Sequence, residues 1–170
     1  MNEKPLINKV AQKAIKQIDL MSFLPKATNI VAFDIKGFLF KELLLKEKDF
    51  REALKKYDFS NLEEKSVYVH CSTDAIIPMW AYMLLATYLH KKAKNVVFAK
   101  SLQEAEEAFV LQNIEMIDLE LYTNQRVVVK GCGEKNFSPL VYITLLRIFQ
   151  PVCKAISFGE ACSMVPVFKK

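Results

Sequence analysis

Three of the four cysteines in this chain come shortly after apolar segments that are typical of β-strands. Cys71, Cys132 and Cys162 lie one to three residues beyond segments that span residues 66–70, 126–130 and 155–159. If these strands run parallel in one sheet, their carboxyl ends share the edge where α/β proteins place their sites. Three thiolates there would suit a tetrahedral zinc ion, with Zn–S bonds of about 2.3 Å. They would also suit an iron–sulfur cluster.

A fourth ligand for such a metal would come from a side chain near the same edge. Asp74 follows Cys71 in the same loop, so we expect Asp74 to complete the site. His70, Glu134, Glu160 and water are the alternatives, although alternation along the strand would turn His70 to the other face. We expect the three sulfur atoms to lie within about 4 Å of one another if they share one metal.

The fourth cysteine, Cys153, precedes its strand instead of following it. It is therefore expected at the opposite edge of the sheet, as a structural thiol that does not bind the metal. A buried cysteine in that position behaves as a small apolar side chain.

Two other functions fit the same residues. Cys71 and Cys132 precede expected helix N-termini, whose dipoles lower a thiol pKa, so either could serve a thiol redox or sulfur-transfer enzyme. The Gly131-Cys132-Gly133 segment, with a helix start near Ser138, could alternatively cradle an anion. The third interpretation is a non-catalytic interaction module with structural cysteines. The sequence specifies neither a substrate nor a reaction.

Composition narrows the class of protein. The chain has 170 residues, 52% hydrophobic and 25% charged, which suits a compact fold of ordinary domain size. The net charge of +5 is carried mostly by dispersed lysines, a pattern that argues against a nucleic-acid partner. The longest apolar run, residues 75–89, is shorter than the roughly 20 residues of a membrane helix. Four cysteines without a secretion signal favour a cytoplasmic protein with reduced thiols.

Short apolar strands alternate with helical patterns along the chain. We predict an amphipathic helix over about residues 6–18, a strand over 30–40 and a helix over 49–57, followed by strands at 66–70, 95–99, 126–130 and 155–159 and helices at 75–90, from Ser101 and from Ser138. We identify no internal repeat or linker. The sequence therefore predicts one domain over residues 1–170, an α/β three-layer sandwich with a mainly parallel sheet built from βαβ units.

The helix expected at residues 75–90 is apolar on every side, and such a helix must be covered on more than one side. It is either a central helix covered by the N-terminal helix or part of a homodimer interface. Both interpretations stay open, and a homodimer is the partner that we expect.

Several segments resemble a family of uncharacterised bacterial proteins catalogued as domain of unknown function 2480. The similar segments are residues 33–36, 45–51, 80–89, 129–132 and 158–166, so the resemblance extends over nearly the whole chain. It implies a small single-domain cytoplasmic protein and no particular activity. In similar members, cysteines occur at the positions that match Cys71, Cys132 and Cys162.

Overall fold

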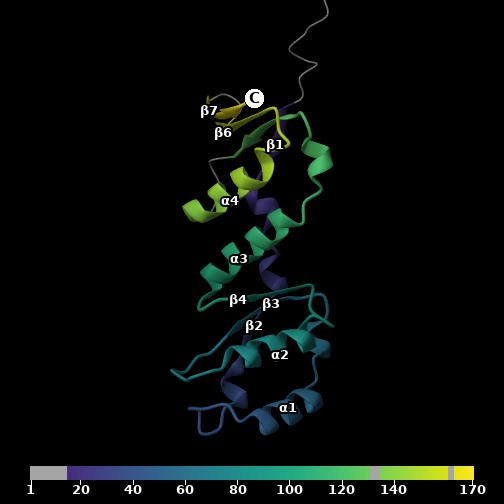
Figure 1. The fold of residues 1–170 in the computed structure, drawn as a ribbon, viewed down its shortest axis with the longest axis vertical. Coiled ribbons are helices and arrows are strands. Elements are labelled where there is room, and N and C mark those ends of the chain that lie inside the picture. Colours follow the sequence, from purple (N-terminus) through teal and green to yellow (C-terminus); the bar gives the residue numbers. More distant parts are fainter. Residues whose placement is uncertain (1–14, 131–134, 161–162) are drawn as a thin grey trace, which may run out of the picture. The chain divides into compact units, whose positions relative to one another are not determined.

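The computed structural model describes residues 15–130, 135–160 and 163–170, and its strands form two sheets (Figure 1). The strands are β1 (Ile15–Ile18), β2 (Ile30–Asp34), β3 (Ser66–His70), β4 (Asn95–Phe98), β5 (Arg126–Val129), β6 (Ala155–Glu160) and β7 (Ser163–Lys169). The helices are α1 (Glu47–Lys56), α2 (Met79–Leu89), α3 (Leu102–Glu115) and α4 (Pro139–Phe149). The short 3-10 helices are η1 (Leu20–Phe23), η2 (Ala27–Asn29), η3 (Ile35–Phe38), η4 (Ser60–Leu62) and η5 (Leu119–Tyr122).

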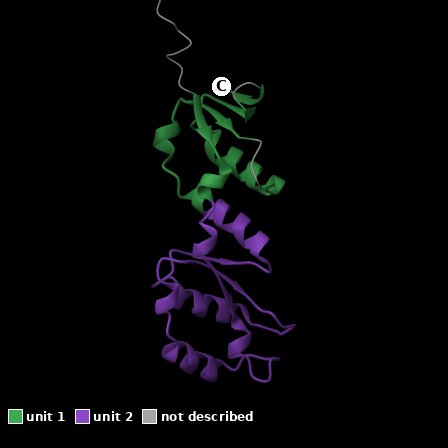
Figure 2. Ribbon diagram, turned by 180° about the vertical axis from the view of Figure 1, so that it is seen from behind, with its two compact units in different colours: residues 1–23, 113–170 green, residues 24–112 purple. Residues whose placement is uncertain are grey.

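The chain divides into two compact units, each with its own sheet (Figure 2). Unit 1 comprises Met1–Phe23 and Asn113–Lys170, and unit 2 comprises Leu24–Gln112. Unit 2 is thus inserted in the chain between β1 and the rest of unit 1. Helix α3 crosses the boundary and contributes residues to both units.

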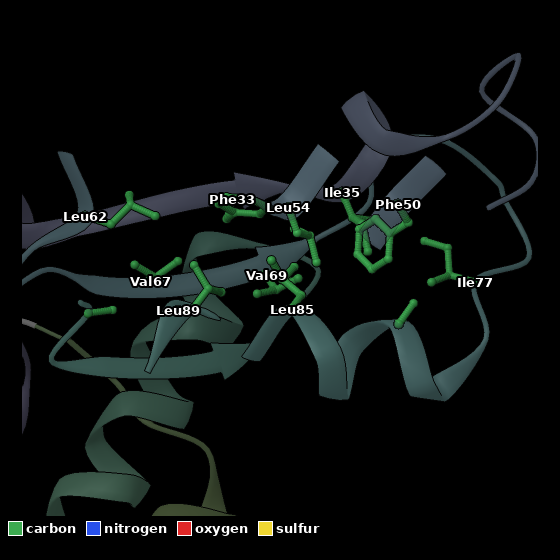
Figure 3. Close-up of a cluster of buried hydrophobic side chains, with 12 residues drawn as sticks. Phe33, Ile35, Phe50, Leu54, Leu62, Val67, Val69, Ile77, Leu85 and Leu89 are labelled. Atoms are coloured by element: carbon green, nitrogen blue, oxygen red, sulfur yellow. The ribbon is translucent and has the colours of Figure 1, made fainter. Parts of the chain in front are cut away.

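The sheet of unit 2 has the order β2-β3-β4 and is wholly parallel. Helix α1 connects β2 to β3, and α2 connects β3 to β4, as parallel neighbours require. Helices α1 and α2 pack on one face of this sheet. Figure 3 shows Leu85 and Leu89 of α2 beside Val67 and Val69 of β3, in one buried cluster.

The opposite face of this sheet is covered by the first part of α3. Tyr68 alternates with the two buried valines of β3 and therefore points to that face. It packs with Val97 of β4 against Ala105 and Phe109 of α3. Helices thus contact both faces of the sheet of unit 2, which explains why its strands are apolar on both sides.

The sheet of unit 1 has the order β1-β5-β6-β7. The first three strands are parallel, and β7 pairs antiparallel with β6. Gly159 of β6, close to the turn into β7, has a φ of 123°. A Cβ atom there would lie 2.4 Å from the backbone oxygen of Ser163, so this position requires glycine.

The two units share an internal repeat with an offset of 60 residues. Strand β3 begins at Ser66 and β5 at Arg126; α2 begins at Met79 and α4 at Pro139; β4 begins at Asn95 and β6 at Ala155. The residues that recur unchanged are Val67, Val69, Tyr82, Leu85, Lys94 and Phe98, which match Val127, Val129, Tyr142, Leu145, Lys154 and Phe158.

Backbone geometry repeats with the same offset. Glu64 and Asn124 both adopt positive φ, at 58° and 56°. The N–H of Glu64 donates to the carbonyl of Lys92 at 3.0 Å, and the N–H of Asn124 donates to that of Val152 at 2.9 Å. The turn before the central strand is therefore tied to the end of the following helix in both units. The absence of a repeat in our sequence analysis was wrong.

Three predicted elements differ from the structure. Ile15–Ile18, expected at the end of a helix over residues 6–18, form β1, because pairing with β5 supplies a ladder that local propensity did not anticipate. Residues 1–14 lie outside the described residues. The strand expected over 30–40 ends at Asp34, whose side chain accepts a hydrogen bond from the N–H of Lys36 and starts η3.

The third difference concerns the helix expected over residues 75–90, which begins only at Met79. The segment before it is extended, and Ile76 forms an isolated bridge with Leu44. Pro78 is the residue before the first helical turn, and proline favours such a boundary because it restricts the residue that precedes it.

The α/β class with mainly parallel pairing is confirmed. The strands lie in two sheets instead of the one that we expected, because the inserted unit 2 forms its own three-stranded ladder. The three-layer sandwich is not confirmed. The single domain stays a prediction, since compact units in one chain can still unfold together.

Candidate functional site

Polar side chains meet where β2 and β3 end. Asp34 closes β2 and lies opposite His70, which closes β3. Oδ1 of Asp34 accepts hydrogen bonds from the backbone N–H groups of Lys36, at 2.9 Å, and Ser72, at 3.1 Å. These two bonds join the loop after β3 to the end of β2. Asp34 therefore organises the carboxyl edge of the sheet of unit 2.

The ionisation of Asp34 reflects this role. Burial disfavours the charged carboxylate, but the hydrogen bonds from Ser72 and Lys36, helped by the nearby His70, outweigh it. The pKa of Asp34 consequently lies below its ordinary value. An ionised carboxylate with committed acceptor atoms serves this edge as a structural anchor.

Cys71 lies half-buried beside this anchor, packed against the core of unit 2. The neighbouring Tyr82 has a raised pKa, caused mainly by burial and secondly by negative charge on Cys71. The helix after Cys71 begins only at Met79. Because the helix dipole acts within the first turn, α2 gives this thiol little of the activation that the sequence analysis expected.

Unit 1 has a comparable anchor at the ends of β1 and β5. Asp19 follows β1, and its Oδ2 lies 3.1 Å from Nζ of Lys130, which follows β5. Oδ1 of Asp19 accepts a hydrogen bond from the N–H of Met21 at 3.0 Å. The pKa of Asp19 is lowered, first by the hydrogen bond from Lys130, against the effect of burial. In both units an aspartate after the first strand joins that strand to the end of the central one.

The structure separates the strands that precede the predicted metal ligands. Cys71 follows β3 in the sheet of unit 2, whereas Cys132 follows β5 and Cys162 follows β6 in the sheet of unit 1. The argument from a common sheet edge therefore no longer includes Cys71. Cys132 and Cys162 themselves lie outside the described residues. Asp74 is exposed in the loop after Cys71.

Two further observations bear on the thiols. Among the described residues, no group of three His, Cys, Asp or Glu side chains could hold a metal ion. Cys153 is fully buried, and burial raises the pKa of its thiol even though Lys170 opposes the shift. This burial agrees with the structural role that we predicted for Cys153.

A repeated apolar surface is the feature that our sequence analysis missed. In unit 2 the ring of Tyr82 contacts that of Phe98 edge to face, with centroids 5.4 Å apart. In unit 1 Tyr142 contacts Phe158 in the same way at 5.7 Å. The next helical residue is also exposed in both units, 71% at Met83 and 65% at Ile143. Aligning the chain with itself at an offset of 60 residues would have revealed these pairs.

In unit 1 this surface is hollowed into an open groove of about 500 Å³. One wall is α4, with Tyr142, Ile143 and Leu146. The floor includes Phe158 of β6 and Val167 of β7. Helix α4 connects β5 to β6, and β7 extends the sheet beyond them. The apolar floor at β6 and β7 is therefore left partly uncovered beside α4.

The fold and these sites define a two-unit α/β protein in which one βαβ frame occurs twice. The chain belongs to the family described as protein of unknown function (DUF2480), whose family model matches residues 4–170. This confirms the resemblance that the sequence indicated. Neither a curated protein nor a solved structure matches the chain significantly. Among the described helices, none has the length and apolar character needed to cross a membrane.

Proposed function

We propose that the protein is a binding module, and that the apolar groove of unit 1 receives an amphipathic helix of a partner protein. The observation that carries this proposal is the uncovered apolar floor of β6 and β7 beside α4. Exposed apolar patches that continue into a groove are typical of protein interaction sites.

A helix fits this groove better than an extended peptide does. Helices on one face of a sheet pack side by side at about 8–10 Å, and the floor continues beyond α4 to β7. Phe158 lies opposite Val165 in the ladder between β6 and β7, and Val165 and Val167 are both more than half exposed. A partner helix with apolar residues at positions i, i+3, i+4 and i+7 would cover these side chains.

The experiment uses the full-length chain and the fluorescent probe 1-anilinonaphthalene-8-sulfonate. Ile143→Glu places a charge in the groove and should weaken binding of the probe at least tenfold, because a carboxylate resists burial against apolar side chains. Met83→Glu is the matched control, since Met83 holds the same position in unit 2 and is similarly exposed. Probe binding that Ile143→Glu leaves unchanged would contradict the groove.

Affinity purification from cells tests the occupant. A partner protein should be retained by the wild type and by Met83→Glu, but lost from Ile143→Glu. The chain has an apolar occupant of its own to compare, because residues 6–14 carry an amphipathic pattern. If deletion of residues 1–14 opens the groove to the probe, and no partner depends on Ile143, the groove binds this segment and the proposal of a partner helix is wrong.

A metal site is the second candidate, in a reduced form. Strands β5 and β6 are parallel neighbours, so the positions after them share one edge, which favours Cys132 and Cys162 as joint ligands. Zinc or iron content of the protein purified without a histidine tag would test it. Cys132→Ser and Cys162→Ser should each release the metal, whereas Cys71→Ser should retain it. A metal-free wild type would exclude the site.

A further inference from the structure

The repeat shows an unequal treatment of one sheet edge. In unit 1 the outer side of β6 is paired with β7. In unit 2 the equivalent strand β4 pairs with β3, and among the described residues no strand lies on its other side. A free strand edge presents unpaired N–H and C=O groups, and such edges readily accept another strand.

Hydrogen bonds identify which groups face this open edge. The N–H of Ala99 donates to the carbonyl of Val69 at 3.2 Å, and the N–H of Asn95 donates to that of Lys65 at 3.4 Å. Because backbone groups alternate in direction along a strand, those of Val96 and Phe98 point away from β3. The matching residues of unit 1, Ile156 and Phe158, pair with Phe168 and Val165 of β7.

The side chains around this edge do little to protect it. The four residues of β4 include neither proline nor a charged residue, the usual devices that prevent edge pairing. Phe98 is 56% exposed, and Met79 and Met83 of the adjacent helix α2 are each 71% exposed. A strand added to this edge would bury apolar surface as well as pair backbone groups.

A second copy of β4 is the occupant that this edge fits. An antiparallel pair of β4 strands with Val97 on the two-fold axis places Val96 of each copy opposite Phe98 of the other. The outward N–H and C=O groups of both residues are then all used, so the edge is complementary to itself. The side-chain pairing also has a precedent in the chain, because Phe158 lies opposite Val165 in the antiparallel ladder of unit 1.

We infer that unit 2 forms a homodimer through antiparallel pairing of β4 with β4 of a second copy, which joins the two three-stranded sheets into one continuous sheet. This inference stands apart from the groove, which lies wholly in unit 1. The same register places the exposed Lys94 of one copy opposite the exposed Lys100 of the other. These like charges weaken the dimer, and salt that screens them strengthens it.

Sedimentation equilibrium on the full chain tests the interface with three variants. Val96→Pro removes an outward N–H and leaves the hydrogen bonds to β3 in place, so the dimer should dissociate at least tenfold more readily. Phe98→Lys should weaken it to a similar degree. Leu43→Lys, which replaces an exposed apolar loop residue of the same unit, is the control and should leave the dissociation constant unchanged.

Charge reversal tests the register. Lys94→Glu turns two repulsive pairs into attractive ones and should tighten the dimer several-fold at low salt. Adding Lys100→Glu to that variant makes both members of each pair negative, so the repulsion returns and the affinity should fall back towards that of the wild type. A dimer that Lys94→Glu loosens would overturn this register.

Amide hydrogen exchange gives a readout that is independent of folding. Protection of the Val96 and Phe98 amides should rise with protein concentration, while protection of Ala99 should stay constant because its N–H is bonded within the unit. A chain that is monomeric at hundreds of micromolar would overturn the inference. A dimer that loses affinity through Ile143→Glu, and not through Phe98→Lys, would overturn it as well.

Discussion

The two units build the same βαβ frame and then diverge at a single equivalent position. After β4 the chain has Ala99 and continues into α3, whereas the matching Gly159 allows the chain to turn into the antiparallel strand β7. Unit 2 thereby keeps an open edge, and unit 1 gains a fourth strand together with the groove beside it. The comparison shows how one backbone conformation, accessible to glycine and not to alanine, decides which surface a repeated frame presents.

The cores of the two frames also differ in composition. Unit 2 is filled largely by stacked and edge-to-face aromatic rings, among them Phe33, Phe38, Tyr57 and Phe59. In unit 1 the equivalent frame is filled mainly by aliphatic side chains of β5 and α4. Cores accept different apolar residues when total volume and pattern are kept, so the frame survives this divergence.

The largest expected effect comes from matched core truncations. Leu85→Ala in unit 2 and Leu145→Ala in unit 1 remove equivalent buried side chains, and each should lower the free energy of unfolding by about 2–5 kcal/mol. Because α3 contributes residues to both units, we expect one unfolding transition. Urea denaturation followed by fluorescence of Trp80 and by circular dichroism measures both. Trp80 unfolding that Leu145→Ala leaves unshifted would show that the units unfold separately.

An intermediate effect is expected at the position where the units diverge. Gly159→Ala forces a side chain into a left-handed conformation and against the backbone of Ser163, and should cost about 1–3 kcal/mol. The reverse change at the equivalent position, Ala99→Gly, should cost only about 0.5–1 kcal/mol. Thermal unfolding of both variants measures the difference. Equal costs would refute the account of the β6–β7 turn.

The smallest effect concerns the aspartates that follow the first strands. Asp34→Asn should cost about 1 kcal/mol at pH 7, and Asp19→Asn less, because its ion pair with Lys130 is partly exposed. Both carboxyls have a pKa below the ordinary value, so their stabilisation is present above about pH 4 and is lost as the pH falls through the folded-state pKa. Urea midpoints should therefore differ between Asp34→Asn and the wild type at neutral pH and converge in acid. A gap that persists in acid would rule out the charge as its source.

Local patterns specified much of the frame. The strand at residues 66–70 appears as predicted, and α4 begins at Pro139 with Ser138 before it, as expected from a serine followed by proline. The N–H of Glu104 donates to Oγ of Ser101, which is the expected cap of α3. These features depend on residues close in sequence, which is why the sequence revealed them.

The predicted metal site failed at the step that needed distant information. Its premise was that the strands before Cys71, Cys132 and Cys162 share one sheet, and neither periodicity nor glycine placement reports which strands pair. The structure pairs β3 with β2 and β4, and β5 with β1 and β6. Strand partners depend on side-chain packing between segments far apart in the chain, so local signals leave them undetermined.

The sequence by itself determined the class of the protein, its central strands and helices, and its family. It also contained the repeat, because Tyr82 with Phe98 and Tyr142 with Phe158 keep both identity and spacing. Only the tertiary structure decided that the strands form two sheets, that β7 covers one edge, and that β4 leaves the equivalent edge open among the described residues. The physical reason is that a strand satisfies its backbone groups only through a partner, and the choice of partner is made by the folded chain as a whole.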